Sequence, residues 1–238
     1  MNLMLTNWFQ KRLQLKFRGP WIALLGPDGC GKSSVIKELE VLFAPPAFVG
    51  TKMIHRRPGI LVPVKPGNHP PGVPIDHYSK PTHNAVRSVV KLIILGLDWF
   101  LGYWVYIVWQ QIKGYLVIFD RYYLLDLWVD PLRYRYNGPS WLVRWIRKLL
   151  PKPDLVILLD APVEVLQSRK QEVSAEESSR QRLAYLKIVQ TLPNGIVVDA
   201  SKPLSQVVAD VKQHILDLGV VYQAGATSTI STDILRRL

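Results

Sequence analysis

The sequence predicts a three-layer α/β fold, in which a sheet of about five parallel strands is flanked by helices. Three observations lead to this prediction. Short apolar runs of strand length alternate with longer helical segments along the 238 residues. A glycine-rich loop separates the first apolar run from the first helical segment. Hydrophobic residues make up 48% of the chain, which is enough for a buried core and argues against disorder.

The first strand and helix surround the sequence LLGPDGCGKSS, residues 24–34. Residues 21–25 are apolar, as in a buried parallel strand, and residues 34–43 have helical periodicity. Between them, G-x-x-x-x-G-K-S is typical of a phosphate-binding loop (P-loop), whose lysine reaches phosphates and whose serine ligates Mg²⁺. The pattern predicts a P-loop NTPase fold, Ser33 as a metal ligand, and ATP bound by Gly26, Asp28, Gly29, Cys30, Gly31, Lys32, Ser33 and Ser34.

The later elements follow from apolar runs and from proline or glycine breaks. We expect strands at 47–54, 115–120, 154–160 and 196–199. We expect helices at 84–113, 124–150 with breaks at Pro131 and Gly138–Pro139, 163–190 and 204–217. One domain would then span residues 20–218, with a proline-rich insertion at 59–83, between a basic amphipathic segment at 1–19 and a flexible tail at 219–238.

The amino-acid composition indicates which cellular compartment and which kinds of ligand to expect. The net charge of +12 favours anionic partners, but no basic run with interleaved aromatic residues resembles a nucleic-acid module. The single cysteine, Cys30, excludes an intramolecular disulfide framework and fits a reducing compartment. We therefore expect a cytoplasmic protein with a small anionic ligand and no nucleic acid.

The N-terminal segment, residues 1–19, could form an amphipathic helix that contacts a membrane. It has no cleavable signal pattern, and Leu5, Trp8 and Leu13 oppose Lys11 and Lys16 on a helical projection. Such a helix would either lie on an anionic membrane face or pack on its own domain. Peripheral contact with the inner face of a membrane is therefore left open.

Residues 92–109 form an apolar stretch at the lower limit of a transmembrane length. Its only ionisable residue, Asp98, would cost about 2.5–3.5 kcal/mol at the centre of a bilayer. A single crossing would also place the P-loop and the Asp120–Arg121 pair on opposite sides of the membrane. We expect a buried helix.

The sequence FDRYY, residues 119–123, ends the predicted strand at 115–120. Ligands of open α/β sheets bind at the carboxyl ends of the strands. There Asp120 could hold Mg²⁺ through water, and Arg121 could bind a phosphate with its two parallel N–H donors. A strand-end ion pair is the structural alternative.

The charged stretch at 168–182 carries Arg169, Lys170, Arg180 and Arg182. Phosphoryl transfer needs positive charge around the migrating group and exclusion of water, and a mobile lid that carries arginines supplies both. The alternative is a solvated helix face with an i,i+4 pair, Glu176–Arg180.

The combination of motifs resembles the thymidylate kinase family of P-loop nucleotide kinases, over roughly residues 20–217. Five stretches carry the resemblance: GPDGCGKSS at 26–34, HRRPG at 55–59, FDRYY at 119–123, PDLVILLDAPVEVLQSR at 153–169 and VVDASKPLSQVVADV at 197–211. The resemblance implies transfer of the ATP γ-phosphate to a nucleoside monophosphate, with ATP and Mg²⁺ required. It also implies that the loop before the last helix lies near the adenine.

The family resemblance also implies roles for single residues. Lys32 and Ser33 would serve ATP and Mg²⁺, Asp28 would hold the acceptor's sugar hydroxyl, and Arg56 and Arg121 would hold the acceptor's phosphate. The predicted catalytic residues are Lys32, Arg121, Arg169 and Arg182, and the predicted acceptor-binding residues are Asp28, Arg56, Asp98 and Arg121.

Three departures from the family pattern concern the acceptor. The family's glutamate in R-E-P-G is Arg57 here, a family arginine before D-R-Y is replaced by Trp99 beside Asp98, and the segment at 59–83 is longer. If Arg57 pointed at the acceptor, the preferred acceptor would carry more, or differently placed, negative charge than dTMP.

Three functions remain open from the sequence alone. The first is a kinase of dTMP or a related nucleoside monophosphate. The second is a kinase of the same fold acting on a sugar or on a membrane glycan or lipid intermediate. The third is a non-catalytic ATP-binding switch. A homodimer is left open in each case.

Overall fold

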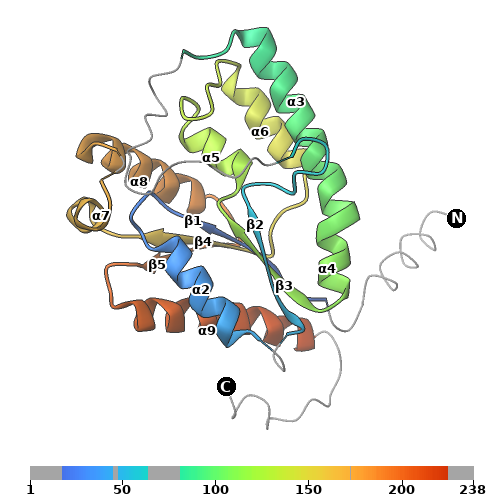
Figure 1. Cartoon of the computed structure of the whole chain (residues 1–238), viewed down its shortest axis with the longest axis vertical. Helices are drawn as coiled ribbons and strands as arrows, with labels where there is room; N and C mark the ends of the chain where they lie inside the picture. Colours follow the sequence, from blue (N-terminus) through green and yellow to red (C-terminus); the bar gives the residue numbers. More distant parts are fainter. Residues whose placement is uncertain (1–17, 45–47, 64–80, 172, 225–238) are drawn as a thin grey trace, which may run out of the picture.

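The computed structural model describes residues 18–44, 48–63, 81–171 and 173–224, with side chains as far as residue 218. Most of the predicted N-terminal segment, most of the proline-rich insertion and the end of the predicted tail lie outside these residues. The described chain forms helices around one sheet (Figure 1).

The sheet is parallel throughout and has five strands in the order β2-β3-β1-β4-β5. The strands are β1 (Trp21–Leu25), β2 (Gly50–His55), β3 (Tyr115–Asp120), β4 (Leu155–Asp160) and β5 (Gly195–Asp199). This confirms the predicted fold class. Because β1 is central, the P-loop that follows it lies between the ends of β3 and β4.

Helices cover both faces of the sheet (Figure 1). They are α2 (Lys32–Leu42), α3 (Ala85–Gly102), the π-helix η1 (Tyr103–Ile107), α4 (Val108–Ile112), α5 (Tyr123–Val129), α6 (Ser140–Leu149), α7 (Val163–Arg169), α8 (Ala175–Val189) and α9 (Leu204–Ala224). Alternate residues of β1 point to opposite faces, so Ile22 and Leu24 pack with α2 and α9, while Trp21 and Leu25 pack with α3, α5 and α8.

The breaks predicted at Pro131 and at Gly138–Pro139 are confirmed, because residues 130–139 form turns that separate α5 from α6. The last helix continues to Ala224, beyond its predicted end at residue 217. Its sequence from 218 to 224, LGVVYQA, lacks a proline that would end the helix.

The long helical region from α3 to α4 contributes one face to the core, as predicted. Among the described residues, Ala85–Ile112 is the one helix long and apolar enough to cross a membrane by length and composition alone. Its inner face carries Leu92, Trp99 and Ile107, all of which are buried. The outer face is exposed, so the helix is half-buried rather than buried.

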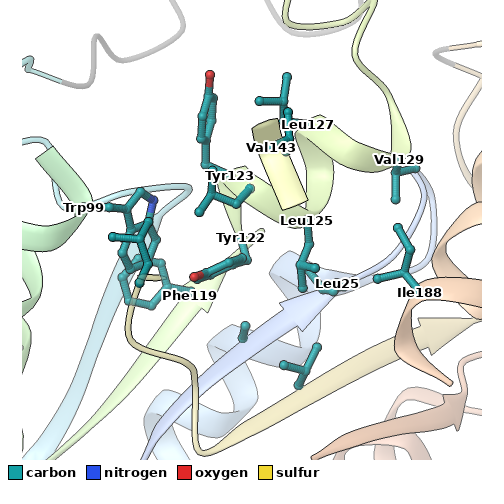
Figure 2. Packing of buried hydrophobic residues seen from close by; sticks show 14 of the residues in the cluster. Leu25, Trp99, Phe119, Tyr122, Tyr123, Leu125, Leu127, Val129, Val143 and Ile188 are labelled. Carbon is teal, nitrogen blue, oxygen red and sulfur yellow. The ribbon is translucent and has the colours of Figure 1, made fainter. Parts of the chain in front are cut away.

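Trp99 packs in an aromatic cluster beside Phe119 and Tyr122 (Figure 2). Its ring centroid is 4.8 Å from that of Tyr122, 4.9 Å from that of Phe119 and 5.9 Å from that of Trp21. The side chain is fully buried. The tryptophan that departs from the family pattern is therefore a core residue that joins α3 to β1 and β3.

We predict that Trp99→Ala lowers the free energy of unfolding by about 3–5 kcal/mol, because it leaves a large cavity among these rings. Trp104→Ala, five residues along the same helical region, should change it by less than about 0.5 kcal/mol, since Trp104 is 56% exposed. Urea unfolding of both variants measures the difference. Equal losses would contradict the burial of Trp99.

Candidate active site

The P-loop turns directly from β1 into α2. Gly31 caps α2 with φ 90°, a left-handed conformation that residues with a Cβ rarely adopt. A Cβ on Gly29 would lie 2.6 Å from the carbonyl oxygen of Leu166 in α7. The glycines therefore let the loop approach α7 and let the N–H groups of α2 open towards an anion.

Lys32 is held inside the loop. Its Nζ donates to the carbonyl oxygens of Gly26 and Pro27, at 2.8 Å each, and lies 3.4 Å from Cys30 Sγ. The ammonium group is therefore positioned in the loop by backbone oxygens. Cys30 is buried and serves as a small wall residue.

Asp28 lies between two arginines. Arg121 donates to its Oδ1 and Arg133 donates to its Oδ2, the latter at 2.9 Å. Burial alone would raise the pKa of Asp28, but the charges of Arg121, Arg133 and Lys32 outweigh it and hold the pKa well below 3.8. The carboxylate is thus ionised and balances two cations that face the P-loop.

Arg121 connects this pair to the rest of the sheet edge. Its φ is 69°, an uncommon left-handed conformation for a residue with a side chain, and its N–H donates to the carbonyl of Leu24. Its guanidinium lies 3.8 Å from Asp126, which accepts a 2.7 Å hydrogen bond from the hydroxyl of Tyr185. Such backbone strain persists where surrounding contacts enforce it, and it is typical of functional sites.

Arg56 has the same conformation at the neighbouring strand end. Its φ is 63°, its N–H donates to the carbonyl of Asp120, and its own carbonyl accepts from the N–H of Tyr123. Its Nε is buried and has no hydrogen-bond partner among the described residues. A buried donor without a partner is suited to an anionic ligand.

Asp120 is a suitable second-sphere or direct ligand for Mg²⁺. Its Oδ2 lies 3.0 Å from Nδ1 of His55, the residue directly opposite it in the β2–β3 pairing, while its Oδ1 is buried and unpartnered among the described residues. The His55 hydrogen bond and the charge of Lys32 outweigh burial and lower the pKa of Asp120. The described residues contain no group of three or more histidine, cysteine, aspartate or glutamate side chains that could hold a metal ion.

The position of Asp98 corrects the prediction that it binds the acceptor. Asp98 is fully buried and accepts hydrogen bonds from the Arg57 guanidinium at 2.8 Å and from the N–H groups of Gly59 and Leu61, at 3.2 and 2.6 Å. Both oxygens are occupied, so Asp98 anchors the loop after β2 instead. Arg57 likewise points at Asp98 and at the Val62 carbonyl, not at an open acceptor site.

A separate cavity of about 240 Å³ lies beside the P-loop on the β5 side. It is lined by the start of α2, the end of α7 and the loop before α9, with Cys30, Gly31, Ser34, Val35, Arg169, Ala200, Lys202, Leu204 and Val207 as its wall. Arg169 donates to the carbonyl of Ala200 at 2.8 Å. The guanidinium of Arg169 thus belongs to the cavity wall, and its catalytic role stays a prediction.

The predicted lid, residues 168–182, includes the end of α7 and the first half of α8. Arg182 donates to both oxygens of Asp160 at the end of β4, at 2.7 and 2.8 Å. Arg180 pairs with Glu177 of its own helix and donates to the carbonyl of Val129. The two arginines thus connect α8 to the ends of β4 and α5, and the lid function stays a prediction.

The strand order divides the site into two halves around the P-loop. Arg56, Arg121 and Arg133 lie on the β2 and β3 side, whereas Arg169 and Lys202 lie on the β5 side. A phosphate chain bound in the P-loop would therefore run between an arginine-rich half and a half with a cavity. Such an arrangement suits transfer of a phosphoryl group between two ligands.

Sequence reasoning missed Arg133. It comes from the turn between α5 and α6, far from the P-loop in the chain, and only folding places it on Asp28. The repeated R-Y-R-Y at 133–136 was the available signal, because cations and aromatic residues gather in ligand sites. The position of Arg133 in the sequence, 105 residues after Asp28, does not indicate that it contacts the P-loop.

The geometry defines the chain as a P-loop nucleotide kinase, and comparison with known proteins names the family. The model of the thymidylate kinase family matches residues 25–211. The chain therefore belongs to the thymidylate kinase family and is a kinase, that is, a phosphotransferase.

Curated relatives and a solved structure are similar to this chain. A probable thymidylate kinase of Pyrobaculum aerophilum is 27% identical over 82% of this chain and 95% of that protein. One of Archaeoglobus fulgidus is 36% identical over 43% of this chain and 54% of that protein. The thymidylate kinase structure of Candida albicans has a TM-score of 0.56 at 20% identity, covers 84% of this chain and 92% of that one, and supports the fold.

We predict that Asp28→Asn lowers the free energy of unfolding by about 3 kcal/mol at pH 7, because two arginines lose a buried counter-ion. Since the folded-state pKa of Asp28 lies below its unfolded value, the stabilisation by ionised Asp28 is present above that value and disappears as the pH falls below about 4. The gap between wild type and Asp28→Asn should therefore close in acid.

Denaturant unfolding between neutral and acidic pH measures this gap. Asp210→Asn is the matched control, since its ion pair with Lys202 is exposed and should contribute little. A gap that stays constant down to low pH would contradict the inferred pKa of Asp28.

Proposed function

We propose that the protein transfers the γ-phosphate of ATP to dTMP. An oxygen of the acceptor's phosphate would attack the γ-phosphorus while the bond to the β–γ bridging oxygen breaks, which yields ADP and dTDP. The observation that carries the proposal is the pair of arginines, Arg121 and Arg133, that contact Asp28 of the P-loop, with Arg56 at the neighbouring strand end. The names of the curated relatives support dTMP among nucleoside monophosphates.

The donor half follows from the P-loop and the cavity beside it. The N–H groups of the loop and the Lys32 ammonium would hold the phosphates of ATP, and the 240 Å³ cavity would take the adenine. Arg169 and Lys202 would then bind the base or ribose. This is consistent with the predicted place of the loop before α9.

Mg²⁺ would be held by Ser33 in the first turn of α2 and by Asp120, whose free oxygen is suited to a metal-bound water. The bound ion would neutralise charge on the phosphates. The Lys32 ammonium, which the loop carbonyls position, would supply a further positive charge beside the phosphates.

The acceptor half accounts for the paired arginines. A guanidinium can bind two oxygens of a phosphate through two parallel hydrogen bonds. Arg121 and Arg133 each donate one hydrogen bond to the Asp28 carboxylate, so both are already directed at an anionic group. Arg56 would supply a further donor. Asp28 itself stays ionised and can accept from a sugar hydroxyl.

The structure removes one argument against dTMP. The charge reversal at Arg57 is balanced inside the chain by buried Asp98, so it adds no free cation at the acceptor. The hypothesis of a more anionic acceptor based on Arg57 loses its support. The proposal also includes the lid, in which Arg180 or Arg182 would leave its carboxylate partner and reach the transferring group.

A second candidate is a kinase of the same fold with an acceptor presented at a membrane. The observation that favours it is the exposed apolar face of the α3–α4 region. We propose a cytoplasmic enzyme in either case, because the chemistry uses ATP and the chain has one cysteine. A non-catalytic switch has less support, since a switch does not need the acceptor arginines.

We predict ADP release with ATP, Mg²⁺ and dTMP, and at least about a 10²-fold loss of kcat in Lys32→Ala, because the P-loop loses its cation. Lys37→Ala, on the exposed face of the same helix, should retain full activity. A coupled ADP assay with dTMP, dUMP, UMP, CMP and sugar or lipid-glycan acceptors makes the measurement. Turnover with the sugar or lipid-glycan acceptors alone would favour the second candidate, a kinase whose acceptor is presented at a membrane.

We predict that Arg133→Gln raises the KM for the acceptor by about tenfold or more and leaves the KM for ATP unchanged, because Arg133 lies on the β3 side of the P-loop. Steady-state kinetics with each substrate varied in turn separates the two values. Arg144→Gln, which is exposed on α6, is the control. A rise in the KM for ATP alone would place Arg133 in the donor half.

A further inference from the structure

The end of β2 places a histidine beside Asp120, the carboxylate proposed for Mg²⁺. His55 and Asp120 are opposite each other in the parallel pairing of β2 with β3, and Nδ1 of His55 lies 3.0 Å from Oδ2 of Asp120. The backbone continues this contact, since the N–H of Arg56 donates to the carbonyl of Asp120 at 3.0 Å. The two strand ends are therefore fixed to each other at the point where the two side chains meet.

Strand alternation directs this pair of side chains to the face of the sheet that α2 covers. Ile54 and Phe119, the residues before them, belong to the core cluster on the opposite face, with α3 and α5. Successive side chains of a strand point to opposite faces, so His55 and Asp120 point away from that cluster. Leu24, which is paired with Asp120 in the sheet, packs with α2. The pair therefore faces the side on which the P-loop helix lies.

The two oxygens of the Asp120 carboxylate have different environments. Oδ2 is bound by His55, whereas Oδ1 is buried and has no hydrogen-bond partner among the described residues. A buried acceptor without a partner is suited to a metal ion or to one of its water ligands. The hydrogen bond from His55 opposes the rotation of the carboxyl group that would exchange the two oxygens. It therefore keeps Oδ1 in one orientation.

The chemistry of histidine suits it to orient a metal ligand. A carboxylate offers acceptors only, so the proton of this hydrogen bond lies on Nδ1 of His55. A neutral imidazole donates the bond without the fixed positive charge by which a lysine or an arginine would repel Mg²⁺. Outer partners that orient a metal ligand in this way typically contribute about tenfold or more to metal affinity.

The exposure of His55 separates this role from a role in folding. The His55 side chain is 45% exposed and the Asp120 side chain is 15% exposed. A pair of this kind contributes about 0–1 kcal/mol to stability, because solvent competes for its hydrogen bond. Removal of the imidazole should therefore leave the fold intact, and any large effect on ligand binding would have to come from the orientation of Asp120.

We propose that His55 is a positioning residue of the kinase, which holds the Asp120 carboxylate in the orientation that presents Oδ1 to the Mg²⁺ of bound Mg²⁺·ATP. His55 acts through Asp120 and is not itself a ligand of the metal or of the nucleotide. The inference rests on the proposed metal role of Asp120. It is independent of the identity of the phosphate acceptor, so binding measurements without an acceptor can test it.

The test measures the Kd of ATP for the full chain by isothermal titration calorimetry, once with Mg²⁺ and once with EDTA. His55→Leu should weaken binding of Mg²⁺·ATP by about tenfold, because the Asp120 carboxylate loses its fixed orientation. Binding of metal-free ATP should stay unchanged, since the contacts of the P-loop remain. His55→Asn, whose Nδ2 can donate in the place of Nδ1, should bind Mg²⁺·ATP within about threefold of wild type.

The matched control is Met53→Leu, because Met53 is 53% exposed and lies two residues before His55 on the same face of β2. It should bind both forms of ATP like wild type.

Asp120→Asn separates the two proposals. If Asp120→Asn weakens binding of Mg²⁺·ATP and His55→Leu does not, the inference about His55 is overturned while the metal role of Asp120 stands. If neither change has an effect, both proposals are overturned. An equal loss in His55→Leu with and without Mg²⁺ would also overturn the inference, because His55 would then act on the P-loop itself. A loss in His55→Asn as large as in His55→Leu would do the same, since the Nδ1 hydrogen bond would not be its cause.

Discussion

The ion pair between Asp28 of the P-loop and Arg121 at the end of β3 is the interaction on which the site depends. It joins residues 93 positions apart, and it does so only because β1 and β3 are neighbours in the sheet. Arg121 accepts a left-handed backbone to make this contact, and Asp126 and Tyr185 support its guanidinium from the other side. Loss of the pair would leave a buried charge on each side.

The central position of β1 explains how one loop can serve two ligands. Residues that follow β2 and β3 gather cations on one side of the P-loop, and residues that follow β4 and β5 form a cavity on the other. Tyr185 and Arg180 of α8 also connect the β4 side to Asp126 and to the Val129 carbonyl on the β3 side. The proposed donor and acceptor sites would therefore lie on either side of the phosphate loop, along the carboxyl edge of the sheet.

The departures from the family pattern become a connected structural unit. Arg57 pairs with Asp98, and Trp99, the next residue, packs in the aromatic cluster with Trp21 of β1 and Phe119 of β3. The same helix thus anchors the loop after β2, completes the core, and leaves its remaining face to solvent. Three roles on one helix account for its high apolar content.

The sequence by itself determined the fold class, the P-loop with Lys32 and Ser33, and the strand-end pair Asp120–Arg121, because these depend on local periodicity and on contiguous motifs. Only the tertiary structure decided that Arg133 pairs with Asp28, that Asp98 anchors a loop, and that Arg169 lines a cavity. Each of these depends on which side chains distant in the chain come together. Burial and pairing are set by packing, and no spacing within one segment encodes them.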